Sequence, residues 1–358
     1  GKEVRTRADR PKRLRGMVTL DPYLCGTNVN IPLRSPGFAL SAQSVPEFRM
    51  ETVSIVIPTL NRQKSLQRAL TSVRAQSGVE NESIEIIVVD NSRDESARAI
   101  IEAFDGEGWP INYLSEPAPG VATARNTGVR AAQGRWIAFL DDDEEARPDW
   151  ISEMLRTLRA TGAQAVFGPV EARADDAGEI GGFAPYFSRA IERPDGDDIT
   201  ELSAYLGTNN SMFERALCLS DGAPFEESLN EIGGEDSLLL ERLTMRGFRF
   251  AWAARAGVVE WVPPRRLDWA YVCKRKFLSG QIRVFVQRMA EPGRAWRIAF
   301  WMVVGLLQFV AAGAASVLFR PFDPSRAQRA SATAYGGLGK VLWTSRFRPT
   351  LYGSGLIS

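Results

Sequence analysis

Four consecutive acidic residues, 141–144, are the first feature of the sequence that could do chemistry. They follow an apolar segment, residues 136–140, whose composition is typical of a buried strand. Four adjacent carboxylates repel one another, and a divalent cation relieves that repulsion. The alternative is a solvated turn before a helix that Asp149 caps. The position of the run at the end of a strand favours the metal site.

Two further acidic positions stand at the ends of predicted elements. Asp90 ends a second apolar segment, where it could accept hydrogen bonds from a base or a ribose, or cap the following turn. Glu235 and Asp236 follow two glycines at a helix start. They could act in a site, or they could only favour the N-terminus of that helix.

Two absences limit the chemistry. The sequence contains no His, and its three Cys, at 25, 218 and 273, are far apart. These facts exclude a structural zinc site, a Ser-His-Asp triad, a Cys-His pair and a zinc deaminase site. Acid-base work or metal binding must therefore fall to Asp and Glu, which favours Mg²⁺ or Mn²⁺. Isolated Cys also indicate a reducing compartment.

The elements that position these acids alternate along the chain. Apolar runs predict strands over residues 53–57, 84–89, 111–114, 136–140, 165–170 and 248–252. Helical spacing predicts helices over residues 61–75, 96–104, 122–132, 150–160 and 237–246. Residues 172–199 are predicted to be a long connection. This order predicts an α/β fold in which helices flank a mostly parallel sheet, with ligands at the carboxyl ends of the strands.

The two ends of the sequence differ from its middle. Residues 1–50 are predicted to be an irregular basic leader, residues 51–290 the α/β domain, and residues 291–358 a basic C-terminal segment. The net charge of +1 divides into +12 over residues 265–358 and −11 over the rest. Within the C-terminal segment, residues 298–319 carry no charge and suit a membrane span.

The basic flanks of that apolar run decide which partner is expected. Arginines stand on both sides of it, so the positive-inside rule does not orient it, and a re-entrant or in-plane helix would satisfy both flanks. A buried helix of a soluble protein is the alternative. Basic residues beside an apolar run favour anionic membrane lipid over nucleic acid. We therefore expect a membrane-associated helix.

The order of the motifs resembles the family-2 glycosyltransferases of the GT-A fold over about residues 53–290. The matching segments are Val53-Ser-Ile-Val-Ile-Pro-Thr-Leu-Asn-Arg62, Ile86-Ile-Val-Val-Asp-Asn-Ser92, Pro119-Gly-Val-Ala-Thr-Ala-Arg-Asn-Thr-Gly128, Phe139-Leu-Asp-Asp-Asp143 and Gly234-Glu-Asp236. Two later segments, Val258-Val-Glu-Trp-Val-Pro-Pro-Arg-Arg266 and Phe277-Leu-Ser-Gly280, resemble the branch that extends lipid-linked exopolysaccharide units, as in succinoglycan assembly.

The resemblance implies a role for each matching position. Asp236 would be the catalytic base, and Asp143 would bind Mn²⁺ or Mg²⁺, with Glu260 as a further ligand where many relatives have a His. Residues along the nucleotide-sugar donor would be Pro58, Thr59, Asn61, Arg62, Asp90, Arg125, Asn126, Asp141 and Asp142. Acceptor or sugar contacts would come from Asn209, Asn210 and Glu235.

The resemblance also implies a reaction. It is inverting transfer of one sugar from a nucleotide-diphosphate sugar, usually a UDP-sugar, to a hydroxyl of a lipid-linked saccharide at the cytoplasmic face of the cell membrane. The Gln-x-x-Arg-Trp motif of processive synthases is absent, so we expect no polymerisation. One alternative is a polyprenyl-phosphate sugar synthase. The other is a catalytically silent nucleotide-sugar-binding scaffold at the membrane.

Overall fold

The computed structural model describes residues 52–104, 106, 108–176 and 178–347, so the predicted leader over residues 1–50 lies outside the described residues. The larger sheet contains β1 (Thr52–Thr59), β2 (Ser83–Asp90), β3 (Ile111–Ser115), β4 (Trp136–Phe139), β6 (Ala165–Phe167), β8 (Ser211–Glu214) and β9 (Phe250–Trp252). The smaller sheet contains β5 (Glu144–Ala146), β7 (Val170–Ala174) and β10 (Val258–Val262).

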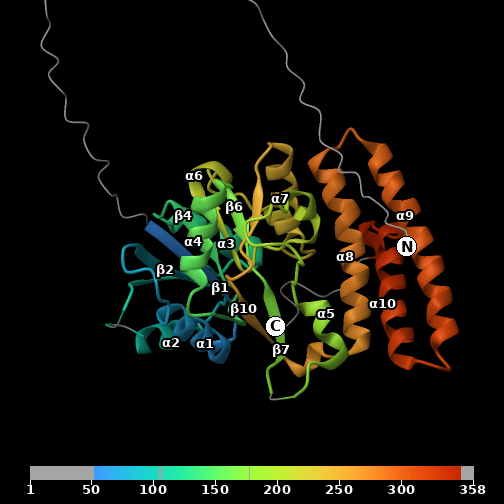
Figure 1. Cartoon of the computed structure of the whole chain (residues 1–358), viewed down its shortest axis with the longest axis horizontal. Coiled ribbons are helices and arrows are strands. Elements are labelled where there is room, and N and C mark those ends of the chain that lie inside the picture. The colour runs from blue at the N-terminus through green and yellow to red at the C-terminus, as the bar shows by residue number, and fades with distance from the viewer. Residues whose placement is uncertain (1–51, 105, 107, 177, 348–358) are drawn as a thin grey trace, which may run out of the picture. The chain divides into compact units, whose positions relative to one another are not determined.

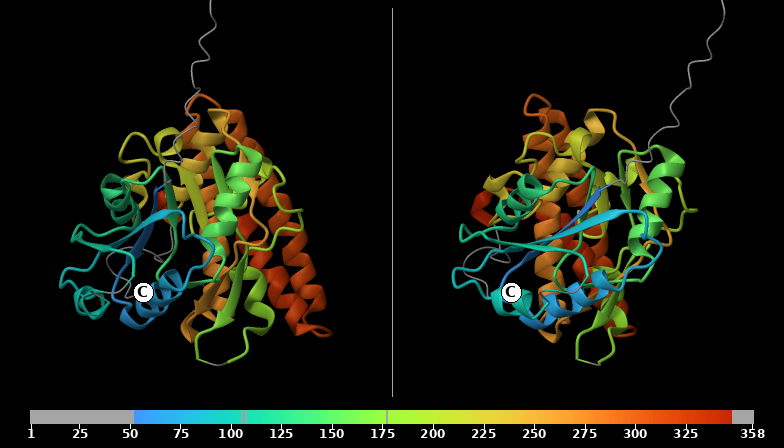
Figure 2. Two further views of the ribbon diagram at one scale, coloured as in Figure 1. Left: turned by 60° about the vertical axis from the view of Figure 1, so that its left-hand side comes forward. Right: turned by 90° about the vertical axis from the view of Figure 1, so that its left-hand side faces the viewer.

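The helices lie around and beside these sheets (Figures 1 and 2). They are α1 (Gln63–Arg74), α2 (Arg98–Ala103), α3 (Val121–Ala131), α4 (Trp150–Thr161), α5 (Ala184–Phe187), α6 (Arg215–Cys218), α7 (Glu235–Met245), α8 (Trp269–Ala290), α9 (Ala295–Phe319) and α10 (Pro324–Val341). The last three, in orange and red, lie side by side in both figures.

The larger sheet has the order β3-β2-β1-β4-β8-β6-β9. Its first four strands are parallel, β8 runs antiparallel to both β4 and β6, and β9 is parallel to β6. Thr59 at the end of β1 pairs with Asp90 at the end of β2. The segments after β1, β2 and β4 therefore meet at one edge, as ligand-binding loops do in such sheets. The predicted mostly parallel α/β fold is confirmed.

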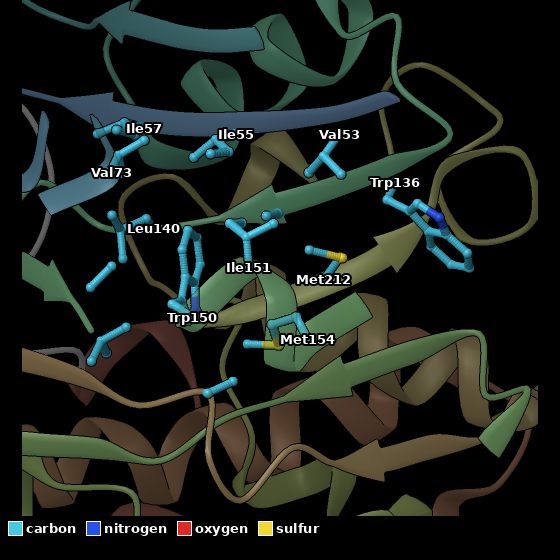
Figure 3. Close-up of a cluster of buried hydrophobic side chains, with 14 of the residues drawn as sticks. Val53, Ile55, Ile57, Val73, Trp136, Leu140, Trp150, Ile151, Met154 and Met212 are labelled. Atoms are coloured by element: carbon cyan, nitrogen blue, oxygen red, sulfur yellow. The ribbon is translucent and has the colours of Figure 1, made fainter. Parts of the chain in front are cut away.

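The two faces of β1 enter two hydrophobic clusters. Ile55 and Ile57 pack with residues of α1 and α4 (Figure 3), whereas Val56, between them, packs with residues of α3. All three side chains are fully buried. Because side chains alternate across a strand, an unbroken apolar run is the pattern of a strand covered on both faces.

One predicted strand was wrong. Residues 165–170 form two strands, β6 and β7, in different sheets, because Gly168 and Pro169 separate them. A Cβ at Gly168 would stand 2.0 Å from the carbonyl oxygen of Ala256, so only glycine allows the chain to cross there. The predicted long connection over residues 172–199 contains the end of β7 and the short α5.

The apolar run 298–319 lies within α9, which is long and apolar enough to cross a membrane. Its two polar residues face α10: Gln308 donates to the carbonyl oxygen of Thr333 at 3.0 Å, and Ser316 donates to that of Ala327 at 2.9 Å. The opposite side of α9 is an exposed apolar face, defined by Trp296, Phe300, Val303, Leu307, Val310 and Val317. The predicted boundary at residue 290 stays a prediction.

Candidate active site

The acidic run of residues 141–144 follows β4, turns at Asp142 and Asp143, and continues into β5, and this turn is largely buried rather than solvated. Asp142 is 4% exposed and Glu144 is 1% exposed. Asp149 does stand at the N-cap of α4, but its side chain makes no capping hydrogen bond. Burying several carboxylates together is costly unless cations or hydrogen-bond donors compensate. The partners of the run are therefore what make this arrangement possible.

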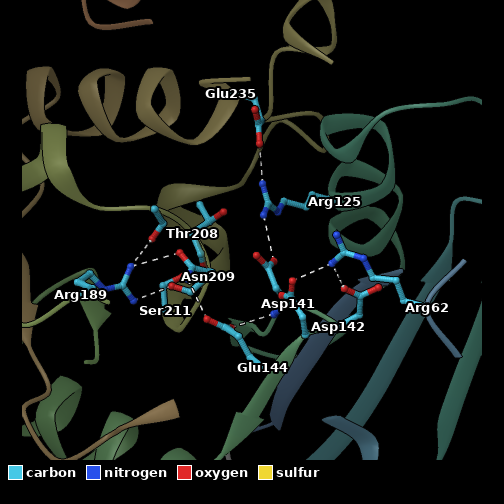
Figure 4. A network of polar contacts seen from close by, with 12 residues as sticks. Arg62, Arg125, Asp141, Asp142, Glu144, Arg189, Thr208, Asn209, Ser211 and Glu235 are labelled. Atoms are coloured by element: carbon cyan, nitrogen blue, oxygen red, sulfur yellow. Dashed lines mark hydrogen bonds and ion pairs between the residues drawn. The ribbon is translucent and has the colours of Figure 1, made fainter. Parts of the chain in front are cut away.

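Arg62 holds two of these carboxylates (Figure 4). Its Nη1 lies 2.9 Å from Oδ1 of Asp142 and 2.9 Å from Oδ2 of Asp143. Thr59, at the end of β1, donates to Asp142 at 2.8 Å. Arg266 contacts the same Oδ2 of Asp143 at 3.3 Å. The turn after β1 and the segment after β10 are thus both tied to the acidic run.

Arg125 connects the acidic run to the start of α7. Its guanidinium lies 3.1 Å from Oδ1 of Asp141 and 2.7 Å from Oε1 of Glu235, and Figure 4 marks both contacts. Arg125 and Glu235 are both buried. A short path of ion pairs therefore joins the two acidic motifs that the sequence placed almost a hundred residues apart.

Two glycines before α7 position Asp236 near the acidic run. Gly233 and Gly234 have φ angles of 77° and 94°, in the left-handed region that glycine adopts without strain. A Cβ at Gly234 would stand 2.6 Å from the side chain of Ile282 in α8. Asp236 itself accepts only a local hydrogen bond from the backbone and hydroxyl of Ser237 among the described residues, which leaves its carboxylate open to the cavity.

A second arginine organises the opposite wall. Arg189 is half-buried and donates to the carbonyl oxygens of Gly207, Asn209 and Asn210 at 2.7–3.1 Å. Asn209 in turn donates to Oε1 of Glu144 at 2.8 Å (Figure 4). The loop that carries Asn209 is therefore fixed against the acidic run from both sides. No sequence signal identifies Arg189, because its partners are backbone atoms of a loop whose path the sequence does not reveal.

One cavity of about 1800 Å³ joins most of the predicted site residues. Those that line it are Pro58, Thr59, Asn61, Arg62, Arg125, Asp141, Asp142, Asp143, Asn209, Glu235, Asp236 and Glu260. Glu144 and Arg266, to which sequence analysis gave no role of their own, line it too. Glu260 pairs with Glu144 across β10 and β5, which brings it to the acidic run.

Three predicted site residues lie behind the cavity wall. Asp90 accepts from the backbone N–H groups of Ser92 and Ala97 at 3.0 and 2.7 Å, and from the hydroxyl of Tyr113. Asn126 exchanges hydrogen bonds with the backbone of Phe225. Asn210 accepts from the indole N–H of Trp150 at 2.7 Å. Their polar atoms are used inside the fold, so in this structure they hold loops in place rather than face the cavity.

Burial raises the pKa of several acids at the site. It is the largest cause for Asp142, whose pKa is about 6, and for Glu235 and Glu260, whose pKa values are about 7. Burial also raises the pKa of Glu144 well above its usual range. The neighbouring carboxylates add to the effect on each of them. Positive charge entering the cavity would therefore be stabilised.

The oxygen donors of the acidic run suit Mg²⁺ or Mn²⁺. Within the described part of the chain, no three Asp, Glu or Cys side chains stand where they could hold one metal ion. Mg²⁺ in nucleotide enzymes is commonly held by one or two carboxylates together with phosphate oxygens of the substrate. The arrangement fits an ion that is shared with a bound diphosphate rather than one held by protein ligands alone.

Sequence comparison identifies relatives over most of this region. The Glycosyl transferase family 2 model matches residues 54–216. The succinoglycan biosynthesis protein ExoM of Rhizobium meliloti is 33% identical over 278 residues, which cover 75% of this chain and 84% of that protein. A Campylobacter jejuni protein named GalNAc(5)-diNAcBac-PP-undecaprenol beta-1,3-glucosyltransferase is 28% identical over 33% of this chain and 38% of its own length.

Structural comparison gives the same fold. The mannosyltransferase PcManGT of Pyrobaculum calidifontis, solved in complex with GDP-Man and Mn²⁺, has a TM-score of 0.54 and 18% sequence identity. The match covers 82% of this chain and 88% of that one. The extent of the ExoM match, together with this fold, confirms both the expected family and the expected enzyme class. The chain belongs to glycosyl transferase family 2, the glycosyltransferases of exopolysaccharide and related glycan synthesis.

Proposed function

We propose that the protein transfers one sugar, with inversion, from a nucleotide-diphosphate sugar to a hydroxyl of a lipid-linked saccharide, with a UDP-sugar as donor. One observation carries the proposal. The turn after β1, the acidic run after β4 and the start of α7 come from distant parts of the sequence, and all three line one cavity. Such a cavity has both a place for a diphosphate with its metal ion and a carboxylate to take a proton.

The donor end of the cavity is formed by the acidic run and its arginines. Asp143, with Glu260 beside it, would hold Mn²⁺ or Mg²⁺, and Asp141 would lie near the ribose. When bound, the ion supplies Lewis-acid stabilisation of the charge that develops on the leaving diphosphate. Arg62 and Arg266 both contact Asp143 and can neutralise further phosphate charge. PcManGT, which shares the fold, was solved with Mn²⁺ and a nucleotide sugar.

The acceptor end is formed by the start of α7. A sugar hydroxyl has a pKa far above 7, so it needs a positioned carboxylate to take its proton as it attacks. Of the two carboxylates at this helix start, that of Asp236 is the one without an ion pair to Arg125, which pairs with Glu235 instead. Attack by the hydroxyl opposite the leaving diphosphate inverts the anomeric carbon. This needs no second acidic group, unlike glycoside hydrolysis by two carboxylates.

The exposed apolar face of α9 supports a lipid-linked acceptor at a membrane. Trp296, Phe300, Val303, Leu307 and Val310 recur every three or four positions, as in a helix that lies in the membrane interface. The neighbouring α10 exposes Arg326, Gln328 and Arg329, which do not suit a second span beside α9. An in-plane α9 at the cytoplasmic face, with anionic lipid around the basic segment, accounts for both observations. The name of the Campylobacter relative contains an undecaprenol-linked saccharide.

Nucleotide release tests this proposal. The wild-type protein and Asp143→Ala are incubated in detergent with Mn²⁺, a polyprenyl-diphosphate-linked monosaccharide as acceptor, and UDP-, GDP- and dTDP-sugars, and the free nucleotide is measured. We expect release from one donor, lost in the variant and on chelation of the metal. Release from no donor, together with donor binding in titrations, would favour the silent scaffold instead. Release from a donor by Asp143→Ala at the wild-type rate would contradict the metal role.

A further inference from the structure

The C-terminal helices pack unusually closely, and glycines make this possible. A Cβ at Gly280 of α8 would stand 2.2 Å from the carbonyl oxygen of Gly336 in α10. A Cβ at Gly339 of α10 would stand 1.9 Å from that of Phe277, and one at Gly305 of α9 would meet Lys340 at 2.5 Å. Each distance is below what a real side chain tolerates, so larger residues would force the helices apart. The glycine that ends the segment Phe277-Leu-Ser-Gly280 is therefore explained by the close approach of α10.

This close packing brings three cations together. Lys276 and Arg283 are seven residues apart on α8, so they share one face of that helix, and Lys340 comes from α10. All three are half-buried and line the same cavity as the acidic run, together with Trp301 and Gln308 of α9. We call Lys276, Arg283 and Lys340 the helix cation cluster.

The helix cation cluster has no ion-pair partner among the residues that the structure describes. Lys340 donates to Oε1 of Gln308 at 2.6 Å, and Arg283 donates to the carbonyl oxygen of Ala204 at 2.7 Å. Lys276 lies over the ring of Tyr186. All of these partners are neutral. The charge of Glu241 attracts Arg283 without forming an ion pair with it, and Glu241 is itself paired with Arg297 at 3.6 Å.

Such a cluster is costly without an anion. Burial lowers the pKa of Lys340, and so does repulsion by Arg283 and Lys276. Burial likewise lowers the pKa of Lys276 and of Arg283. A bound phosphate would remove this repulsion and would gain charge-assisted hydrogen bonds in a partly desolvated place. The cluster therefore has the properties of an anion site.

The surroundings of the cluster indicate which anion it takes. The carboxylate of Asp236 lines the same cavity, so a saccharide can extend from the cluster to the catalytic base. Trp301 and Gln308 of α9 line the cavity as well, and the other side of α9 is its exposed apolar face. A molecule with a saccharide, then a phosphate group, then a long apolar chain matches this sequence of surfaces.

We propose that Lys276, Arg283 and Lys340 bind the diphosphate of a polyprenyl-diphosphate-linked saccharide acceptor. This rests on the proposed function only in that the acceptor is lipid-linked. The cluster holds the diphosphate while the apolar chain runs toward the exposed face of α9 and the membrane. In this way the cluster sets the distance from the membrane at which the acceptor sugar reaches Asp236. Sequence motifs assign no such role to these residues.

Binding of farnesyl diphosphate to the full chain in detergent tests the proposal without donor, metal or turnover. We expect wild type to bind it by isothermal titration, and Lys276→Gln, Arg283→Gln and Lys340→Gln each to raise the Kd about tenfold to a hundredfold, as expected for loss of one charge-assisted hydrogen bond. Lys64→Gln, the same change on the exposed surface of α1, should leave the Kd within twofold. Farnesol should bind more weakly and be insensitive to all four changes.

Three results would overturn the proposal. The first is equal farnesyl diphosphate binding by wild type and all three cluster variants. The second is inorganic pyrophosphate binding as tightly as farnesyl diphosphate, which would assign the cluster to a soluble diphosphate. The third is a matching rise in the Kd for the nucleotide-sugar donor, which would assign it to the donor. Arg283→Lys, which keeps the charge, and thermal unfolding of each variant separate loss of the site from loss of the fold. A protein that binds farnesyl diphosphate but transfers no sugar would refute the proposed function alone.

Discussion

Replacing Glu235 by Gln should make the protein more stable at pH 8 and leave its stability almost unchanged at pH 5. Glu235 is 5% exposed and is paired with Arg125 at 2.7 Å, yet burial, followed by the charge of Asp236, raises its pKa from 4.5 to about 7. In the unfolded chain this group titrates near its ordinary value. Between these two values the folded protein binds more protons than the unfolded chain, so stability falls as the pH rises through this interval.

The size of the effect follows from the same two values. At 1.36 kcal/mol per pH unit, the ionised Glu235 costs about 3 kcal/mol of folding free energy above pH 7. Glutamine keeps an oxygen for Arg125 and never ionises, so Glu235→Gln should recover most of that cost at pH 8. For a chain of this size we expect a rise of about 5 °C in the midpoint of thermal unfolding. At pH 5, where Glu235 is mostly protonated, the rise should be less than about 2 °C.

Thermal unfolding followed by circular dichroism in detergent, at pH 5 and pH 8, measures both values. Glu102→Gln is the matched control, because Glu102 is exposed on α2. Its effect on the unfolding midpoint should be the same at the two pH values. A midpoint for Glu235→Gln below that of the wild type at pH 8 would refute the reasoning. It would mean that the ion pair with Arg125 outweighs burial and the charge of Asp236.

Three other experiments test the helix packing, the exposed apolar face of α9 and the packing around α6. Gly339→Ala should lower the unfolding midpoint by several degrees, because overpacking costs about 1–3 kcal/mol and the added Cβ would stand 1.9 Å from the Phe277 carbonyl oxygen; an unchanged midpoint would show that α8 and α10 are not closely packed. The double change Leu307→Ser and Val310→Ser should weaken binding to phosphatidylglycerol vesicles in flotation assays at least about tenfold, whereas Leu217→Ser, an exposed site on α6, should not. Burial raises the pKa of Cys218 to about 12, so iodoacetamide at pH 8 should modify it only after unfolding; rapid labelling of the native protein, detected by mass spectrometry, would contradict the packing around α6.

The first half of the fold could be predicted because its signals are local. Strand β1 is a run of apolar residues covered on both faces, and Leu66, Leu70 and Val73 of α1 recur at helical spacing. The C-terminal helices α8 and α10 were not predicted. The apolar positions of α8 follow no simple period, and α10 contains Gly336, Gly337 and Gly339, which disfavour a helix in isolation. Only the packing against neighbouring helices makes them stable.

The same distinction applies to the candidate site. Acidic residues at strand and helix ends could be found from order and spacing alone, and twelve of the fifteen predicted site residues line the cavity. Asp90, Asn126 and Asn210 do not, because their partners Tyr113, Phe225 and Trp150 come from other elements. A motif gives the position of a residue in the chain, but the partners that turn a polar side chain inward are set by the tertiary fold.

Sugar transfer by Asp236→Asn tests the central claim most directly. The rate of transfer from the active nucleotide sugar to a polyprenyl-diphosphate-linked monosaccharide is measured for both proteins, together with the Kd for the donor. We predict a loss of at least about a hundredfold in rate, with the Kd within threefold of the wild type, because the carboxylate acts only on the attacking hydroxyl. Transfer by Asp236→Asn at the wild-type rate would contradict this account and would favour a phosphate acceptor, which needs no strong base.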